Sequence, residues 1–489
     1  MSDVLFVEPS SKIQRLQNIK SKKPHLGAPL PLIYISTYLL DAGHDVDIID
    51  LRVDTEGCLG DYLKRERPLL AGISIMPGNA LPRAIELSRL IKNHSPNTKV
   101  IWGGSFPSLH QKLCMDIPEL DYIVSGDGEE TMTELVTEIK ERGGNFDPSQ
   151  INGLVYRRDG EIEAGSPRKP VDLDYKPIGA WQLVDKYMPY YLGPKGYLAI
   201  NAARGCPFKC SFCYNNLLHQ GYKSYRAKSV EKVMEEVDWL TLRYKINKIQ
   251  FMDDDFLAQR NRGFRLLKAI REKHPHMKFH LAARVDELNK EEFVKKLAEV
   301  GCESVFLGVE SGSTEQLEQM AKGCSTSDTF DTAKLCKKYG ITCVYSFTCG
   351  FPEETFDNLY ESVETARILH EIDPGSWSVM EIISPILGTP LYNDLEIKQE
   401  VPEMVPARWC YFSDWKSAKN KPWIQNQGFY EAYQLAFYFS FSSRGHASES
   451  RPLSKFLSRW SRMRLLRKKP RLLPEFRLLN FMIKKVVWG

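Results

Sequence analysis

The sequence predicts an α/β protein made of a doubly wound parallel sheet, a partial (β/α)6 barrel and a helical region at the carboxyl end. Three observations predict this arrangement. Short apolar runs alternate with helical stretches, this alternation occurs twice along the 489 residues, and several expected strands are followed by glycine-rich loops. We therefore expect one domain at 1–145, a linker at 146–195, the barrel at 196–394 and a mostly helical region at 395–489.

The first domain is expected to contain five strands. They are Val4–Val7, Val46–Ile49, Leu70–Ile75, Val100–Trp102 and Tyr122–Val124. Helical stretches are expected between them at Pro31–Ala42, Ala80–Lys92 and Glu129–Arg142, with a weaker signal after Asp54. Strands that alternate with helices form a parallel sheet, and such sheets bind ligands on the loops beyond the carboxyl ends of their strands.

Glycines are concentrated in the loops that should form this edge of the sheet. The loops are Gly72-Ile73-Ser74, Gly103-Gly104-Ser105 and Gly126-Asp127-Gly128-Glu129. Because glycine has no side chain, its backbone can approach a large ligand closely. The first domain is therefore expected to bind a large ligand here.

The expected linker contains several breaks in regular structure. They are Asp147-Pro148, Gly165-Ser166-Pro167 and Lys176-Pro177. Two short β-type runs, Leu154–Arg157 and Glu161–Glu163, flank Asp159-Gly160. This pattern predicts a hairpin within the linker.

The second series supplies six strands and five helices. The strands are Leu198–Asn201, Lys248–Met252, Lys278–Ala282, Ser304–Leu307, Cys343–Thr348 and Ser378–Ile383. The helices are Ser229–Leu242, Arg262–His274, Lys290–Gly301, Ser327–Tyr339 and Asn358–Ile372, with Ser229 and Ser327 as expected caps. Six βα repeats make a partial TIM-type barrel, in which reacting groups lie at the carboxyl ends of the strands.

The most informative segment is Arg204-Gly205-Cys206-Pro207-Phe208-Lys209-Cys210-Ser211-Phe212-Cys213-Tyr214, which follows the first barrel strand. Three thiolates on one short loop can hold three irons of a [4Fe–4S] cluster. No fourth cysteine occurs at cluster spacing, so the fourth iron is expected to bind another molecule. The loop therefore predicts a reactive cluster.

Two other interpretations of these cysteines were weighed. A structural zinc site needs four ligands, usually from two Cys-x2-Cys pairs, and here the nearest later cysteine is Cys302. A disulfide is less favoured, because the chain has 11 cysteines, an odd number, and no secretory signal. The other cysteines are expected to be small buried apolar residues.

The cysteine motif resembles the signature of the radical S-adenosylmethionine (SAM) superfamily. This resemblance implies that Cys206, Cys210 and Cys213 hold the cluster and that the open iron binds the amino and carboxylate groups of SAM. It further implies an external one-electron reductant of the flavodoxin or ferredoxin type. The electron splits SAM into methionine and a 5′-deoxyadenosyl radical.

The same resemblance implies contacts with SAM at the strand ends. Phe212 is expected near the adenine or, alternatively, packed under the loop, and the acids Asp253, Asp254 and Asp255 suit the SAM ammonium. Glu310 is expected at the ribose hydroxyls, as an acid is in dinucleotide-binding domains. Further contacts are implied at Ser311, Gly350 and Pro385.

Arg284 follows the third barrel strand and has two expected roles. Its planar guanidinium suits the SAM carboxylate. Alternatively, it forms a surface ion pair with Asp286 or Glu287. No residue is assigned as a catalytic acid or base.

The first domain resembles the flavodoxin- or Rossmann-like cobalamin (B12) domain found ahead of the barrel in one radical SAM subfamily. The matching motifs are Leu26-Gly27-Ala28-Pro29-Leu30, Ala42-Gly43-His44-Asp45-Val46 and Gly103-Gly104. The implied cobalamin contacts are Gly72, Ser74, Met76, Gly103, Gly104, Gly126, Gly128 and Glu129. The motif Asp-x-His-x-x-Gly, whose histidine binds cobalt in many cobalamin proteins, does not occur, and His25 and His44 are expected at the surface.

The resemblance to cobalamin-dependent radical SAM enzymes implies a methyltransferase. After the adenosyl radical removes hydrogen from the substrate, a methyl group would pass from methylcobalamin to an unactivated carbon. The same motifs also fit a cobalamin-dependent cyclase or ring-rearrangement enzyme, of the kind that closes a tetrapyrrole ring. A non-catalytic cobalamin or redox sensor is the third interpretation.

Charge is unevenly distributed along the chain. Residues 451–489 contain twelve Lys or Arg and one acid, whereas the whole chain has a net charge of +4. Large apolar residues lie between these cations, so the tail is expected either to pack on the protein or to touch a membrane surface. A small-molecule or lipid-like hydrophobic substrate is favoured over nucleic acid, and a cytoplasmic monomer is expected, peripheral to the inner membrane face if the tail binds lipid.

Overall fold

The computed structural model describes residues 2–10, 26–76, 80–143, 145–176, 178–193, 196–218, 224–397, 421–424, 426–441, 452–466 and 476–478. These residues form two compact units. The first unit contains residues 2–199 and 217–246, and the second contains 200–216, 247–397 and the described segments beyond residue 420.

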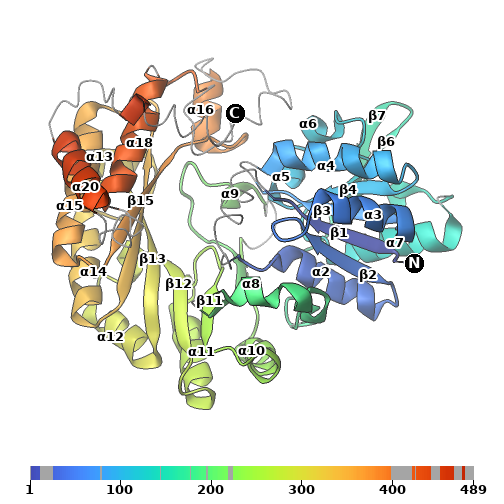
Figure 1. Ribbon diagram of the computed structural model, residues 1–489, viewed down its shortest axis with the longest axis horizontal. Coiled ribbons are helices and arrows are strands. Elements are labelled where there is room, and N and C mark those ends of the chain that lie inside the picture. Colours follow the sequence, from blue (N-terminus) through green and yellow to red (C-terminus); the bar gives the residue numbers. More distant parts are fainter. Residues whose placement is uncertain are drawn as a thin grey trace. The chain divides into compact units, whose positions relative to one another are not determined.

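The first unit is built on a seven-stranded sheet with the order β2-β1-β3-β4-β5-β6-β7 (Figure 1). Five strands are parallel, as predicted: β1 (Val4–Glu8), β2 (Val46–Asp50), β3 (Leu70–Ser74), β4 (Lys99–Gly103) and β5 (Tyr122–Val124). In this order the chain reverses direction across the sheet between β1 and β3, and ligands of such sheets bind at that point.

The hairpin expected in the linker is part of this sheet. Its strands, β6 (Leu154–Arg158) and β7 (Glu161–Ala164), pair antiparallel with each other, and β6 pairs antiparallel with β5. The turn at Asp159-Gly160 places both residues at positive φ, which matches the turn chemistry of short hairpins. The hairpin therefore extends the first sheet.

Helices cover the parallel strands of the first unit. They are α2 (Leu30–Asp41), α3 (Glu56–Glu66), α4 (Ala80–His94), α5 (Ser105–Leu109), α6 (Gln111–Met115) and α7 (Glu129–Arg142). Helix α2 packs against α7, and α3 packs against α4. Inside the sheet, Gly72 gives room to a neighbouring ring, because a Cβ there would lie 2.7 Å from the side chain of Phe6.

Helix α10 (Val230–Tyr244) also belongs to the first unit, although the sequence order places it among the barrel helices. Its Glu236 is fully buried and accepts hydrogen bonds from the Tyr34 hydroxyl, at 2.9 Å, and from Trp181 Nε1, at 3.0 Å. Lys228 Nζ lies 2.9 Å from the same carboxylate. Trp181 begins η2 (Trp181–Tyr187), which is followed by α8 (Met188–Leu192).

The barrel strands have the order β15-β14-β13-β12-β11-β8, and they belong to the second unit except for residues 197–199 of β8, which are grouped with the first. Their bounds are β8 (Tyr197–Ile200), β11 (Lys248–Phe251), β12 (Lys278–Arg284), β13 (Cys302–Glu310), β14 (Thr342–Cys349) and β15 (Trp377–Ile382). Neighbouring pairs from β11 to β15 are parallel. All six predicted strands are confirmed, and the carboxyl ends of the parallel strands lie at one edge of the sheet.

Helices follow the barrel strands and line one side of the sheet in Figure 1. They are α11 (Arg260–Lys273), α12 (Glu291–Val300), α14 (Thr326–Lys338) and α15 (Phe356–Ile372). A short helix, α13 (Thr314–Gln319), was not predicted. Ser229 caps α10 as predicted, but Ser325 caps α14 instead of Ser327, because Ser325 Oγ accepts from the Asp328 N–H at 3.3 Å.

The described carboxyl-terminal residues are helical, as expected. The helices are α16 (Pro390–Ile397), α18 (Gln427–Phe441) and α20 (Pro452–Leu465). In the basic tail, the Trp460 ring stacks on Phe476 at 5.3 Å, and Arg462 donates to the Ser440 carbonyl at 2.8 Å. This part of the tail therefore packs on the protein, whereas Trp409 and Trp415 lie outside the described residues.

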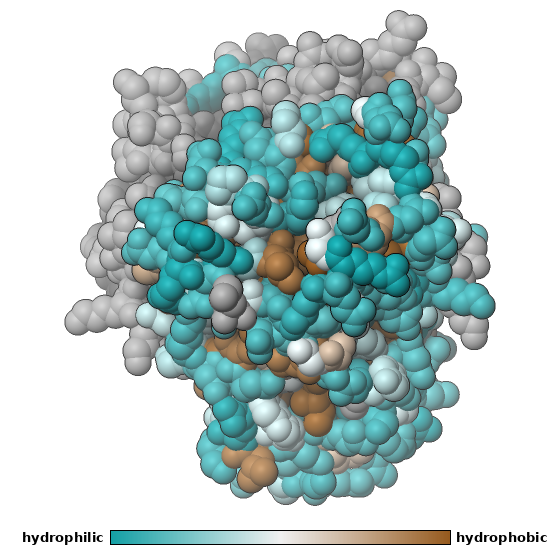
Figure 2. Space-filling model, turned by 90° about the vertical axis from the view of Figure 1, so that its right-hand side faces the viewer, coloured by the Kyte–Doolittle hydropathy of each residue, from teal (hydrophilic) through white to brown (hydrophobic). Residues whose placement is uncertain are grey.

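Two surface properties bear on partners. Figure 2 shows a face on which hydrophilic side chains predominate and hydrophobic ones form small separate spots. Among the helices that the structure describes, none combines the length and the apolar character needed to cross a bilayer.

Candidate functional site

The three cysteines lie on the segment between β9 (Ala203–Gly205) and α9 (Asn215–Leu218). Cys210 is buried, while Cys206 and Cys213 are partly exposed. The Cys213 N–H donates to the Cys210 carbonyl at 3.1 Å, which turns the loop tightly. Neighbouring segments hold the loop at Ser211, whose N–H donates to the Met320 carbonyl and whose carbonyl accepts from the Leu391 N–H.

The donor set of this loop fits an iron–sulfur cluster. Burial raises the pKa of Cys206 to about 12 and that of Cys213 to about 11, so both thiols keep their protons until a metal replaces them. Three sulfur donors on one loop are the ligand type that iron–sulfur clusters select. Within the described ranges, no group of three His, Cys, Asp or Glu converges on a single-ion position.

Asp253 and Asp254, which follow β11, support the start of the cysteine loop. Asp253 Oδ1 accepts from the Ala202 N–H at 2.7 Å, and Asp254 Oδ2 accepts from the Gly205 N–H at 3.1 Å. Burial raises the pKa of Asp253 to about 7. Two of the three acids predicted for SAM therefore also fix the backbone that leads into Cys206.

Asp255 forms a pair with a second buried carboxyl. The pKa of Glu287 is raised to about 8, mainly by burial and secondly by the negative charge of the nearby Asp255. Burial also raises the pKa of Asp255. Asp255 Oδ1 accepts from the Leu257 N–H at 3.2 Å, and Glu287 Oε2 accepts from the Arg284 N–H at 3.1 Å. This pair holds a proton near the carboxyl ends of β11 and β12, and sequence reasoning missed Glu287 as its member.

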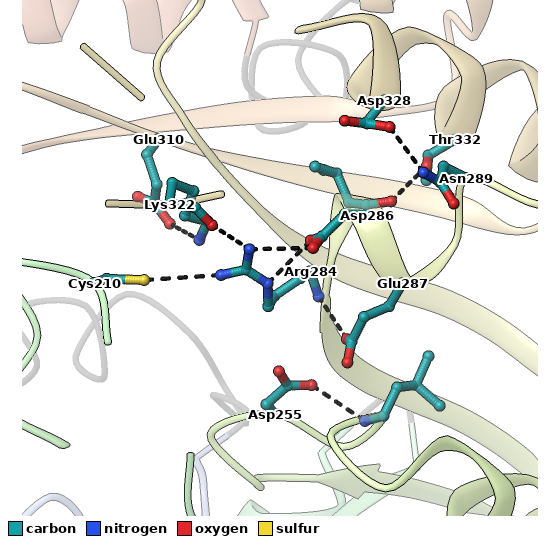
Figure 3. Close-up of polar contacts among 12 residues, drawn as sticks. Cys210, Asp255, Arg284, Asp286, Glu287, Asn289, Glu310, Lys322, Asp328 and Thr332 are labelled. Carbon is teal, nitrogen blue, oxygen red and sulfur yellow. Dashed lines mark hydrogen bonds and ion pairs between the residues drawn. The ribbon is translucent and has the colours of Figure 1, made fainter. Parts of the chain in front are cut away.

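Arg284, the last residue of β12, forms the expected ion pair with Asp286, but Arg284 is buried and not at the surface as predicted. Its Nε lies 3.0 Å from Asp286 Oδ1, and its Nη2 lies 3.2 Å from Asp286 Oδ2 (Figure 3). Nη2 also donates to the Lys322 carbonyl. The Nη1 atom lies 3.8 Å from Cys210 Sγ, so this side chain reaches the cysteine loop. A role toward the SAM carboxylate stays a prediction.

Glu310 ends β13 at positive φ and has partners on both oxygens. Lys322 Nζ lies 2.9 Å from Oε1, and the Thr348 hydroxyl donates to Oε2 at 3.0 Å. The next residue, Ser311, is buried, and its hydroxyl donates to Gln316 Oε1 at 2.6 Å. Sequence reasoning missed Lys322, because it follows a helix that the pattern did not reveal.

Gly350 and Phe212 lie in a packed part of the barrel edge. Gly350 has φ +82°, and its N–H donates to Glu354 Oε2 at 2.8 Å. Phe212 packs against Met320, Phe351 and Ile383, which agrees with the packing role weighed for it. Burial raises the pKa of Glu354 to about 7, and Pro385 is buried.

In the first unit, most residues predicted to bind cobalamin gather at the carboxyl ends of neighbouring strands. Ser74 ends β3 and pairs with Gly103 at the end of β4. Gly104 has φ +96°, and a Cβ there would lie 2.7 Å from the Ile75 carbonyl oxygen. Gly126 has φ +80° with open space beside it. These glycines leave a backbone-lined edge that fits a large ligand.

The remaining candidates of the first unit have different surroundings. Gly128 and the buried Glu129 begin α7, while Met76 is 48% exposed beyond β3. Gly72 lies within β3 and not in a loop. His44 is buried, with Nε2 2.9 Å from the Thr137 hydroxyl, so the expectation of a surface histidine was wrong. His25 lies outside the described residues.

Comparison with family models matches both units. The radical SAM superfamily model matches residues 200–366, which include all three loop cysteines and the carboxyl ends of β11 to β14. The B12 binding domain model matches residues 20–136, which include the glycine-rich strand ends.

Three relatives show the breadth of the family. The chain is 32% identical to an uncharacterized methyltransferase of Pyrococcus horikoshii, over 75% of this chain and 78% of the relative. It is 25% identical to an anaerobic magnesium-protoporphyrin IX monomethyl ester cyclase of Synechocystis, over 81% of this chain and 78% of the relative. It is 31% identical to the hopanoid C-3 methylase of Methylococcus capsulatus, over 64% of this chain and 59% of the relative.

Two solved structures share the fold. The radical SAM methyltransferase TsrM of Kitasatospora setae, with cobalamin and a [4Fe–4S] cluster bound, has a TM-score of 0.65 and 22% identity, over 81% of this chain and 75% of that one. The cobalamin-dependent radical SAM enzyme OxsB, with aqua-cobalamin and SAM bound, has a TM-score of 0.70 and 18% identity, over 99% and 75%.

The geometry and the comparisons lead to the same assignment. The cysteine loop offers three sulfurs at the barrel edge, and the first sheet offers a glycine-lined edge at its strand ends. The chain therefore belongs to the radical SAM superfamily as an enzyme with a B12-binding domain, and its cofactors are a [4Fe–4S] cluster, SAM and cobalamin.

Proposed function

We propose that this enzyme is a C-methyltransferase that transfers a methyl group, by way of cobalamin, to an unactivated carbon of a small or lipid-like hydrophobic substrate. When bound, the cluster and SAM supply the radical that removes hydrogen from the substrate, and cobalamin supplies the methyl group. The residues of this chain bind these groups, orient them and keep water away from the reacting carbon.

The cysteine loop is the observation that carries the proposal. It presents three sulfurs, and its backbone is tied to Asp253 through Ala202 and to Met320 through Ser211. A loop held from two sides keeps the ligand sulfurs in place when SAM binds and leaves. Among the relatives, an uncharacterized methyltransferase matches 75% of the chain, and a hopanoid C-3 methylase is 31% identical.

A cobalamin-dependent cyclase is the second candidate function. The specific observation in its favour is the 25% identity to a tetrapyrrole cyclase over 81% of this chain. Both reactions start with removal of a substrate hydrogen, so the residues that hold the cluster and SAM serve either one. They differ in whether the methyl group of SAM reaches the product.

Labelling of the SAM methyl group tests the proposal. Protein loaded with iron, sulfide and cobalamin is reduced with dithionite and incubated with methyl-deuterated SAM and a bacterial lipid extract. We expect 5′-deoxyadenosine, deuterium on the bound cobalamin and a deuterated lipid product, all lost in Cys206→Ala. A new product without deuterium would favour the cyclase, and wild-type protein that forms neither 5′-deoxyadenosine nor labelled cobalamin would contradict both.

A further inference from the structure

Arg284 connects the end of β12 to the cysteine loop through two contacts. Its Nη1 lies 3.8 Å from Cys210 Sγ, and its guanidinium carbon lies 4.0 Å from the centre of the Phe208 ring. Both partners belong to the loop that holds the cluster. Arg284 itself is 6% exposed, so bulk water screens its charge only weakly.

The guanidinium is held in this position by groups on its far side. Asp286 accepts from Nε and Nη2, and the Lys322 carbonyl also accepts from Nη2 (Figure 3). The donors on that side are therefore committed, and Nη1 is the one directed at the cysteine sulfur. Because these partners fix the planar guanidinium, its Nη1 edge presents positive charge to Cys210 in one orientation.

Lys322 supplies a second buried positive charge in the same place. It is 7% exposed, and its Nζ lies 2.9 Å from Glu310 Oε1. The Lys322 carbonyl accepts from Arg284 Nη2, so the two cationic residues are neighbours, and Asp286 and Glu310 compensate their charges.

An acid lies on the other side of the loop. Asp254 Oδ2 accepts from the Gly205 N–H at 3.1 Å, one residue before Cys206. These contacts place a cation at Cys210 and an acid ahead of Cys206. Reduction adds an electron to a cluster that three thiolates already make negative, and a nearby cation stabilises that added charge.

We propose that Arg284 is a positioning residue that raises the reduction potential of the cluster by facing the sulfur of Cys210. The inference rests on the cluster assignment. It gives Arg284 a role in electron uptake, which precedes cleavage of SAM. It also explains why the Arg284 fork is occupied by Asp286 and a carbonyl, because those partners fix the direction of Nη1.

The test is the midpoint potential of the reconstituted cluster, measured by EPR-monitored redox titration of the full-length protein without substrate. Arg284→Gln removes the charge and is expected to lower the reduction equilibrium constant about tenfold, which is about 59 mV for one electron. Asp286→Asn removes a compensating negative charge and is expected to shift the potential upward. Arg284→Lys, which keeps the charge, should retain most of the wild-type value.

Arg271→Gln is the matched control. Arg271 is a partly buried arginine on α11 whose Nη1 donates to the Met277 carbonyl at 3.1 Å, so its loss should leave the potential unchanged. The comparison uses variants with full iron content. The proposal is overturned if the midpoint potential of Arg284→Gln equals that of Arg271→Gln, or if it shifts in the same direction as that of Asp286→Asn. If Arg284→Gln does not load iron, an unchanged potential in Asp286→Asn overturns it. Wild-type protein without a reducible cluster would instead refute the cluster assignment.

Discussion

Two buried carboxylates of the barrel hold loops in place by accepting hydrogen bonds from backbone N–H groups. Asp253 accepts from Ala202 ahead of the cysteine loop, and Glu354 accepts from the Gly350 N–H ahead of its own loop. An unsatisfied buried N–H costs about 1–3 kcal/mol. Each acid therefore stabilises the fold by accepting from such a group, whether or not it also contacts SAM. Both acids have a pKa raised to about 7 by burial.

Glu354 provides a prediction on pH. Because its pKa is higher in the folded state than its usual value of 4.5, the folded protein binds its proton more tightly than the unfolded chain does. This contribution to stability is complete below pH 4.5 and is lost as the pH rises through 7. In urea unfolding from pH 5 to 8, wild-type protein should lose stability relative to Glu354→Gln. Equal slopes for the two proteins would contradict the raised pKa.

At the scale of elements, one buried residue of α10, Glu236, holds this helix to the first unit. Glu236 receives hydrogen bonds from α2 through Tyr34 and from η2 through Trp181, and it pairs with Lys228. A buried carboxylate with all these donors is satisfied, but removal of its charge takes away the carboxylate partner of the buried Lys228 ammonium. The helix is therefore fixed to the first unit by a network and not by apolar packing alone.

Glu236→Ala should reduce the free energy of unfolding by about 3–5 kcal/mol, the usual cost of breaking a buried pair. Its neighbour Glu235 is the control, because it pairs only at the surface with Lys232, at 2.7 Å. Glu235→Ala should cost less than about 1 kcal/mol. Urea denaturation of both variants checks this, and equal losses would show that the network does not stabilise the unit.

At the scale of the whole molecule, the sequence was sufficient for the strands of both main sheets and their long helices, but not for short helices such as α13 or for the partners of each element. Strand and helix alternation predicted both sheets, because periodicity reflects which face of each element is buried. The unit to which α10 belongs could not be predicted, since it depends on Tyr34 and Trp181, which are distant in sequence from Glu236. The sequence predicted Ser327 as the cap of α14 in place of Ser325, because two serines only two residues apart satisfy the same local pattern.

The candidate site shows the same division. The three cysteines could be found because their ligands are adjacent in the sequence, and the acids after β11 could be found because barrel chemistry lies at strand ends. Lys322 and Glu287 could not, because only tertiary structure brings them to Arg284 and Asp255. Arg284 was identified, but its direction toward Cys210 required the folded structure.

Metal analysis of anaerobically reconstituted protein tests the central claim most directly. We expect about four irons and four sulfides per chain, a reduced-state EPR signal that changes when SAM is added, and loss of the cluster in Cys206→Ala, Cys210→Ala and Cys213→Ala. Cys324→Ala, which removes a partly buried cysteine near Arg284, should retain the cluster. Stoichiometric zinc, loss of the cluster in Cys324→Ala, or a signal that is indifferent to SAM would contradict the account.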